Sequence, residues 1–232
     1  MIETRIERLK ANLKRAVDSS HRSFEDITII AVTKTTDAQT AAKLLPLGIN
    51  NFGENRVDKL IEKQDALIDE KIIWHLIGTL QRRKVKDIIN RIDYFHALDS
   101  LKLASEIDKR TKKIINCFVQ INVAKEESKH GIMVKEACAF IEDLSEFSKI
   151  RVVGLMTMAP IDANEDVLRN IFSTLKGIQE EIEEKKLEHA PCTELSMGMS
   201  RDFPIAVEEG ATFIRVGSTI FTEDSNGTIG QS

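Results

Sequence analysis

The sequence predicts an α/β fold, a single-domain (β/α)8 or TIM barrel, and three observations support this prediction. Eight short apolar segments rich in β-branched residues alternate with amphipathic helical segments along the 232 residues. Such alternation is typical of parallel strands joined by right-handed crossovers. Eight is also the number of strands that closes a sheet into a barrel with a packed interior. No stretch rich in Pro, Gly or Ser divides the chain into separate domains.

An open doubly wound sheet is the alternative architecture for this pattern. It would leave the first and last strands unpaired on one side, and it usually carries a glycine-rich turn after the first strand. The residues that follow the first predicted strand, TTDA, include no glycine. The closed barrel is therefore the better-supported prediction.

The individual elements follow from apolar spacing and turn signals. An opening amphipathic helix covers residues 2–18, where apolar residues such as Leu9 and Leu13 recur at helical spacing. Asp37 is expected to cap the helix after the first strand, and Gly48 lies just past its end. The predicted strands cover residues 27–34, 49–52, 72–78, 94–99, 116–124, 151–159, 193–198 and 212–221. The helices between them carry apolar residues within 41–45, 57–68, 85–92, 103–107, 137–144 and 168–182, and a short seventh helix covers about 201–209.

Composition and length limit the number of domains and the classes of function that we expect. We expect one domain over residues 1–224 and a frayed tail over 225–232. A net charge of -4 and an aromatic content of 5% offer neither a basic stripe nor stacking platforms, so we expect no nucleic-acid partner. The first 20 residues are too charged for a signal peptide and no later run reaches membrane-spanning length, so we expect a cytoplasmic protein without membrane contact.

The three cysteines indicate neither a disulfide framework nor a metal site. Cys117, Cys138 and Cys192 have no paired spacing, and each falls within a predicted element or connection. We expect them to be reduced and structural, with no metal bound.

The first strand, ITIIAVTK, ends at a lysine. Its β-branched and alanine residues suit a strand that is buried on both faces, which places Lys34 where that strand leaves the core. Partial desolvation there would lower the pKa of the amine and favour the neutral, nucleophilic form that an imine-forming lysine requires. Taken alone, the pattern fits a lysine that simply reaches into water.

Small and hydroxylated residues gather after the seventh and eighth strands, and their carboxyl ends face the shared mouth of a barrel. These residues are Ser200, Gly217, Ser218 and Thr219. Backbone N–H groups in Ser/Gly turns and at a helix N-terminus bind anions without a basic residue. Alternatively, Ser200 caps the short seventh helix and the glycine turn only ends the eighth strand. Because both loops fall at the usual phosphate site of this barrel, we favour a phosphate site.

A lysine after the first strand that faces a phosphate site suggests a phosphorylated aldehyde held as a Schiff base, and pyridoxal 5'-phosphate (PLP) is the candidate. Arg215, an inward candidate on the eighth strand, would then lie near the ring. An arginine stays protonated, so it would donate a hydrogen bond to the pyridine nitrogen and disfavour protonation of that nitrogen. The alternative for Arg215 is a salt bridge inside the barrel.

Seven stretches carry a resemblance to a known family. They are AVTK, NFGEN, HLIGTLQ, QINVAKEESKHG, GLMTMAP, ELSMGMSRD and IRVGSTIF. On these stretches the sequence resembles the pyridoxal phosphate homeostasis protein family, also called the YggS or PROSC family, from the first helix to the eighth strand. The last two stretches in succession are highly specific, whereas AVTK alone is a weak signal.

The resemblance implies a fold and a set of contacts. The fold is the barrel of the N-terminal domain of alanine racemase standing alone, with Lys34 as the covalent attachment point for PLP. The remaining implied contacts are the phosphate contacts Ser200, Gly217 and Ser218 or Thr219, the ring-nitrogen contact Arg215, and Asn55, His75 and Met199 near the cofactor. Met199 could equally be a core methionine. Departures from the family pattern at Thr79, Arg83 and the IFTE end of the last motif concern contacts at the rim.

The resemblance also implies a function. Family members are thought to bind PLP and deliver it to acceptor enzymes in vitamin B6 homeostasis, without an established turnover reaction, and we expect a monomer. Racemases of this fold add a second domain that supplies a tyrosine as a second acid/base. This chain has one tyrosine, Tyr94, and no room for that domain, so a two-base mechanism lacks its partner. The alternatives are a single-domain fold-type III PLP racemase or lyase, and a Schiff-base aldolase on the same barrel.

Overall fold

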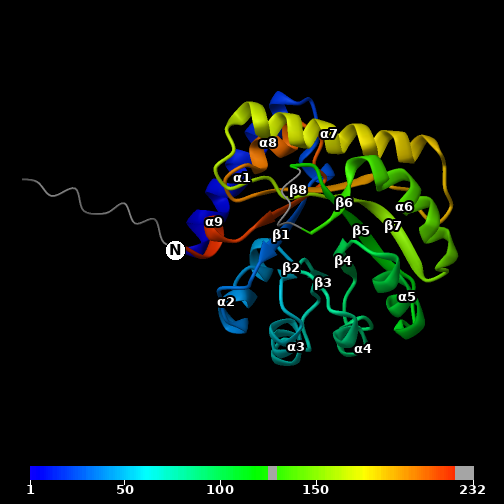
Figure 1. Cartoon of the computed structure of the whole chain (residues 1–232). Coiled ribbons are helices and arrows are strands. Elements are labelled where there is room, and N and C mark those ends of the chain that lie inside the picture. Colours follow the sequence, from blue (N-terminus) through cyan, green and yellow to red (C-terminus); the bar gives the residue numbers. More distant parts are fainter. Residues whose placement is uncertain (125–129, 223–232) are drawn as a thin grey trace, which may run out of the picture.

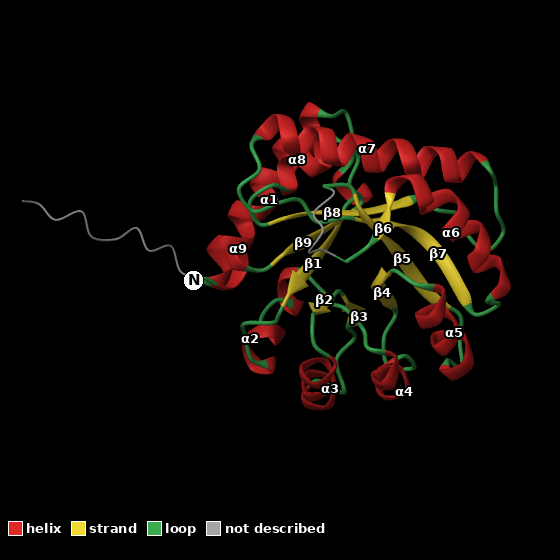
Figure 2. Ribbon diagram, in the orientation of Figure 1, coloured by secondary structure: helices red, strands yellow, loops and turns green. Residues whose placement is uncertain are grey.

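Hydrogen bonds between β4 and β5 close a parallel sheet into a barrel. The computed structural model describes residues 1–124 and 130–222, and the two figures of the whole chain show this barrel encircled by helices (Figure 1 and Figure 2). The strands of the ring are β1 (Thr28–Val32), β2 (Asn51–Glu54), β3 (Ile73–Leu76), β4 (Tyr94–Leu98), β5 (Ile115–Asn122), β7 (Ile150–Met156), β8 (Glu194–Met199) and β9 (Phe213–Val216). β1 pairs with both β2 and β9, so the predicted eight-stranded barrel is confirmed. The two-residue strand β6 (Ile132–Met133) pairs with the end of β5.

Helices cover the outside of the ring. They are α1 (Ile2–Ser19), α2 (Ala38–Ala42), α3 (Val57–Ala66), α4 (Val85–Ile88), α5 (Leu101–Arg110), α6 (Ala137–Asp143), α7 (Glu165–Glu184), α8 (Phe203–Glu208) and α9 (Ser218–Phe221). The predicted opening helix and the cap of α2 are confirmed, because the Asp37 carboxylate accepts a hydrogen bond from the Thr40 N–H at 2.7 Å. Gly48 has φ +80°, the left-handed conformation that glycine favours. Among the described residues, no helix combines the length and apolar character that crossing a bilayer requires.

Six of the predicted strands extend past the observed carboxyl ends, and two of these differences affect residues expected at the site. The eighth predicted strand stops at Val216, and Ser218–Phe221 form helix α9, in which the Ile220 and Phe221 N–H groups both donate to the Gly217 carbonyl at 2.9 Å. β1 stops at Val32, and a turn follows in which the Thr36 N–H donates to the Thr33 carbonyl at 3.0 Å. Short apolar runs do not by themselves separate strand from helix, which is why the prediction extended both strands.

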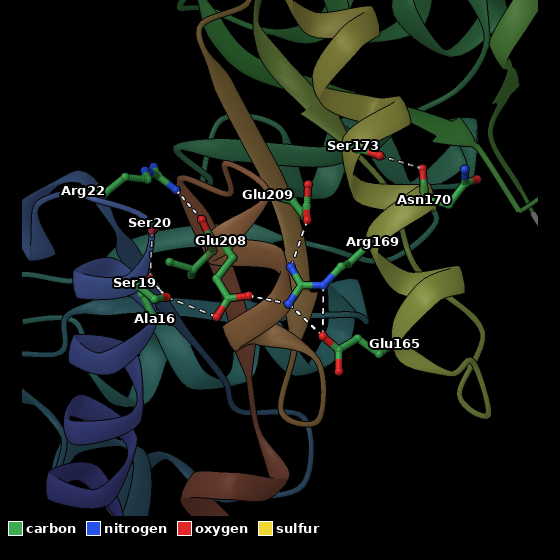
Figure 3. A network of polar contacts seen from close by, with 11 residues as sticks. Ala16, Ser19, Ser20, Arg22, Glu165, Arg169, Asn170, Ser173, Glu208 and Glu209 are labelled. Atoms are coloured by element: carbon green, nitrogen blue, oxygen red, sulfur yellow. Dashed lines mark hydrogen bonds and ion pairs between the residues drawn. The ribbon is translucent and has the colours of Figure 1, made fainter.

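α1 packs on α8 and α9, so the first helix lies beside the last described helix (Figure 1). Arg169 of α7 donates to Glu165 at 2.8 Å, to Glu208 at 2.7 Å and to Glu209 at 3.0 Å, and the Ser19 hydroxyl of α1 donates to Glu208 at 3.2 Å (Figure 3). This network joins three helices that are distant in sequence on one side of the barrel.

Aromatic rings fill the barrel interior on the amino-terminal side of Arg215. The Phe118 and Phe213 centroids are 5.2 Å apart with the rings edge to face, and His75 stacks on Tyr94 at 4.7 Å. Phe213 precedes Arg215 by two residues on the same strand, so the two side chains point to the same face at different depths. The interior is therefore a packed core below Arg215, and a ligand site can open only above it.

Candidate functional site

A cavity of about 720 Å³ opens at the carboxyl ends of the strands. Volumes of this size are typical of sites for small molecules. The predicted site residues that line it are Lys34, Asn55, Met199, Ser200, Arg215, Gly217 and Ser218. Two predicted residues, His75 and Thr219, are not among its lining residues. The topology thus brings most of the expected residues to one place, from loops far apart in the sequence.

Lys34 lies in the turn that follows β1. The residue is exposed, so the expectation of a partly desolvated amine is wrong, because β1 ends two residues earlier than predicted. Within residues 1–124 and 130–222, its side chain has no hydrogen-bond or ion-pair partner. The amine is therefore accessible at the mouth of the cavity and is not held by another group.

A buried ion pair holds the backbone next to Lys34. The Lys63 ammonium of α3 donates to the Thr33 carbonyl at 2.7 Å and also to the Glu54 carboxylate, and both charged residues are buried. The same carboxylate accepts the Thr33 hydroxyl at 2.7 Å. Sequence reasoning quoted the stretch NFGEN but missed this role of Glu54. An acidic residue at the end of a buried strand, nine residues before a lysine on the next helix, was the available signal.

Ser200 brings the two glycine and serine loops together. Its hydroxyl oxygen accepts hydrogen bonds from the Gly217 N–H at 3.2 Å and from the Thr219 N–H at 3.3 Å. The expectation that Ser200 opens the seventh helix is wrong, because α8 begins at Phe203 after Asp202. Two backbone donors thus fix the Ser200 hydroxyl beside the cavity, where its own proton can be donated to an anion.

Gly198 lets β8 turn into this loop. Its φ is +87°, and a Cβ atom at this position would lie 2.6 Å from the Cβ of Ala206 and 3.0 Å from the backbone of Phe203. A larger residue would therefore need both a strained backbone and displacement of α8.

Arg215 is buried and reaches the cavity from β9. Its Nη1 donates to the Ser196 hydroxyl at 2.6 Å and its Nη2 donates to the Thr157 carbonyl at 2.8 Å. Among the described residues no carboxylate forms a salt bridge with Arg215. This argues against the alternative of a salt bridge inside the barrel. Burial lowers the pKa of Arg215 to about 10, so the guanidinium remains charged at neutral pH.

Asp202 is a second buried charge that sequence reasoning missed, although it lies in the quoted stretch ELSMGMSRD. It lines the cavity, and its carboxylate accepts a hydrogen bond from the Met199 N–H. Burial raises the pKa of Asp202, and the charge of Arg215 opposes that shift. The cavity therefore contains a carboxylate near its guanidinium without direct pairing between them.

Comparisons with known proteins agree with this geometry. The family model described as alanine racemase, N-terminal domain, matches residues 5–224. The pyridoxal phosphate homeostasis protein of Aquifex aeolicus is 33% identical over 222 residues, which cover 94% of this chain and 96% of that protein. The chain belongs to the pyridoxal phosphate homeostasis protein family.

Other relatives of this pyridoxal phosphate homeostasis family member include the human protein of that name, 36% identical over 208 residues, 84% of this chain and 76% of that protein. Among solved structures, PipY of Synechococcus elongatus with PLP bound superposes with a TM-score of 0.83 at 30% identity, covering 95% of this chain and all of PipY. Alanine racemase from Corynebacterium glutamicum superposes with a TM-score of 0.70 at 15% identity, covering 100% of this chain and 62% of that chain, which shows a shared fold alone.

His75 lies inside the barrel, in the layer below the cavity. It is fully buried, and its ring nitrogens contact His96 at 3.0 Å and the Asn51 side chain at 2.9 Å. Burial lowers the pKa of His75 to about 3 and also holds the pKa of His96 well below its ordinary value. Tyr94 belongs to the same ring layer and does not line the cavity, so it is not positioned as a second base.

The rim adds residues that sequence reasoning missed. His130 lines the cavity, and its Nδ1 lies 3.7 Å from the Asp99 carboxylate, whose pKa burial raises. Thr79 also lines the cavity, whereas Arg83 does not. Most of the family stretch KEESKHG, residues 125–129, lies outside the described residues.

The cysteines lie away from the cavity. All three are free thiols, and Cys117 and Cys192 are buried. Burial raises the pKa of Cys192 to about 12, which disfavours the reactive thiolate. Within the part of the chain that the structure describes, no three His, Cys, Asp or Glu side chains gather as metal ligands.

Replacing Lys63 tests the anchor beside Lys34. In Lys63→Met, the buried Glu54 carboxylate and the Thr33 carbonyl lose their cationic partner, so we expect the free energy of unfolding to fall by about 3–5 kcal/mol. Urea denaturation measures this change. Lys59→Met, on the same helix, removes an exposed ion pair with Glu62 and should lower the free energy of unfolding much less. Equal losses in the two variants would show that the buried pair does not stabilise this turn.

The two buried histidines predict a pH dependence of stability. Because burial lowers their pKa in the native state, the unfolded chain binds more protons below about pH 6.5, and for His75 this window extends to about pH 3. Stability should therefore fall as the pH decreases through this window, by about 1.4 kcal/mol per pH unit for each histidine. Urea denaturation at pH 7 and pH 5 measures this slope.

His75→Gln should show a smaller loss of stability between those pH values than the wild type. His21→Asn, at an exposed position, is the control for the removal of a histidine. A His75→Gln variant with the wild-type slope would contradict the assignment of the pH dependence to the buried ring.

Proposed function

We propose that this protein binds PLP in the cavity, with Lys34 as the covalent attachment point, and acts as a PLP carrier in vitamin B6 homeostasis. The observation that carries the proposal is the convergence of three groups on one cavity. An exposed amine, a buried guanidinium and a hydroxyl with two backbone N–H groups beside it all belong to that site. The names of the relatives and the PLP-bound structure of PipY support it.

The residues of the cavity match the chemical parts of PLP. The Ser200 hydroxyl, held by the N–H groups of Gly217 and Thr219, offers its own proton to a phosphate, and Ser218 stands in the same loop. Arg215 retains N–H donors besides the two that bind Ser196 and Thr157, and these suit the ring nitrogen. Met199 and Asn55 line the walls between these ends. His75 acts from behind this layer rather than on the ligand.

PLP supplies an aldehyde, which condenses reversibly with a primary amine and releases water. The exposure of Lys34 supports a carrier role, because an accessible amine permits both loading and exchange with an acceptor. Arg215, a donor that keeps its own proton, disfavours protonation of the ring nitrogen and so weakens the ring as an electron sink. Both features favour holding the ligand over turning over a substrate.

We further propose that the protein works as a cytoplasmic monomer that passes PLP to acceptor enzymes. The closed barrel buries its own core, and this supports a monomer. The competing function is a single-domain racemase or lyase. One observation favours it: His130, next to Asp99, lines the cavity and could serve as a second proton-transfer group.

A trapping experiment tests the attachment point. The purified protein is mixed with PLP, reduced with borohydride and digested, and the modified peptide is identified by mass spectrometry. We expect the adduct on Lys34 in the wild type and its loss in Lys34→Ala. Lys43→Ala, at another exposed lysine beyond β1, should keep the adduct. An adduct of unchanged yield in Lys34→Ala would place the covalent site elsewhere.

Proton exchange separates carrier from enzyme. The PLP-loaded protein is incubated in deuterated water with a panel of amino acids, and α-deuterium incorporation is followed by NMR. We expect no sustained incorporation, and we expect transfer of PLP to an apo-enzyme added to the same protein. Sustained incorporation that disappears in His130→Ala would favour the enzyme and contradict the carrier proposal.

A further inference from the structure

A chain of hydrogen bonds crosses the barrel interior from Asn51 to Arg215. Its members come from five strands, β2, β3, β4, β8 and β9. Asn51 Oδ1 lies 2.9 Å from His75 Nε2, His75 Nδ1 lies 3.0 Å from His96 Nε2, and His96 Nδ1 lies 2.9 Å from Ser196 Oγ. Arg215 Nη1 donates to the same Ser196 oxygen at 2.6 Å. The two imidazoles and the serine are fully buried.

The end of the chain at Asn51 sets its direction. The Asn51 amide nitrogen donates to Asn50 Oδ1 at 3.1 Å, so the carbonyl oxygen of the amide faces His75. A carbonyl oxygen can only accept, and His75 Nε2 must therefore carry the proton and donate. Burial keeps His75 neutral, so its Nδ1 has no proton and accepts from His96 Nε2.

The same reasoning continues to the arginine. With the proton on Nε2, neutral His96 must accept at Nδ1, and the Ser196 hydroxyl is the donor there. The lone pairs of Ser196 then remain for the arginine, which can only donate. Every donor meets an acceptor in this arrangement. The reversed tautomers would require the Asn51 amide to turn and to leave Asn50.

We propose that Asn51, His75, His96 and Ser196 are positioning residues that hold the guanidinium of Arg215 in one orientation at the floor of the cavity. The Thr157 carbonyl, 2.8 Å from Nη2, provides the second fixed acceptor. Both acceptors are neutral, so Arg215 is oriented without an opposing carboxylate in direct contact and its charge stays directed to the cavity. The importance of that orientation for the ring of a bound cofactor rests on the proposed function, whereas the hydrogen-bond chain itself does not.

The first test uses the protein without PLP. Nitrogen NMR of histidine-labelled protein reports which ring nitrogen of each imidazole carries the proton. We expect His75 and His96 both to be neutral and protonated on Nε2 at pH 7. A proton on Nδ1 of either ring would overturn the inferred direction, whether or not the protein binds PLP.

Two variants at the far end of the chain test the coupling to Arg215. Asn51→Leu removes the acceptor that fixes His75, so the rings should exchange between tautomers and the side-chain N–H signals of Arg215 should broaden. Asn51→Asp keeps an acceptor for the Nε2 proton of His75 and should keep that proton in place. Sharp Arg215 signals and unchanged tautomers in Asn51→Leu would show that the chain does not position the arginine. His21→Asn is the control at an exposed histidine.

A third variant acts next to the arginine. Ser196→Ala removes one of its two acceptors, and we expect broadened Arg215 signals in the unloaded protein and roughly tenfold faster loss of PLP from the loaded protein. Wild-type protein that fails to retain PLP would refute the proposed function, while the NMR signatures would still decide the positioning role. Retention and Arg215 signals equal to wild type in Ser196→Ala would overturn that role. Thermal unfolding confirms that each variant is folded.

Discussion

β9 pairs with β1 on one side and with β8 on the other, and these pairings bring the loops of the site together. Because all ring strands run parallel, closing the sheet places all their carboxyl ends around one opening. Lys34 follows β1 and Ser200 follows β8, so they reach the same cavity from either side of β9. The chemistry of the site is thus a consequence of strand closure, with each loop contributing a single part.

Below that opening, the barrel interior combines an apolar layer with a polar one. Phe118 and Phe213 pack edge to face, while His75 and His96 lie among the same rings with their nitrogens paired. A buried polar group is costly unless it is hydrogen-bonded, and this constraint determines the proton position on each imidazole. The buried cation above them is oriented by neutral groups, which differs from the common solution of pairing arginine with a carboxylate.

Much of the fold and of the site could be predicted from the sequence. Alternating apolar runs and helical spacing revealed the strands of the ring, because parallel strands buried on both faces leave a strong pattern. Lys34, Ser200 and Gly217 could be predicted because residues at strand ends share one mouth. The exposure of Lys34 could not be predicted, because it depends on where β1 ends. The residues Thr33 and Lys34 after an apolar run do not mark the end of the strand.

Other features of the site could not be predicted because they depend on how deep a residue lies in the barrel and on contacts between residues far apart in the sequence. His75 was expected near the cofactor, but its position along β3 and the stagger of the barrel place it in the layer beneath. The spacing of Glu54 and Lys63 is compatible with a pair between a strand end and a helix, but it does not show that both side chains are buried. The role of Ser200 joins two loops, which local spacing does not show. The segment after Val216 became a helix although its apolar and β-branched residues also suit a strand.

The placement of α1 against α8 and α9 has a consequence for biosynthesis. The first 19 residues pack on elements formed by residues 203–221, and β9 must insert between β1 and β8 before the ring is complete. A chain emerging from the ribosome therefore carries Lys34 long before it has Arg215 or Gly217. Because those groups lie in β9 and the turn after it, a nascent chain that stops before Gly217 lacks part of the site, and ligand capture must await synthesis of that turn.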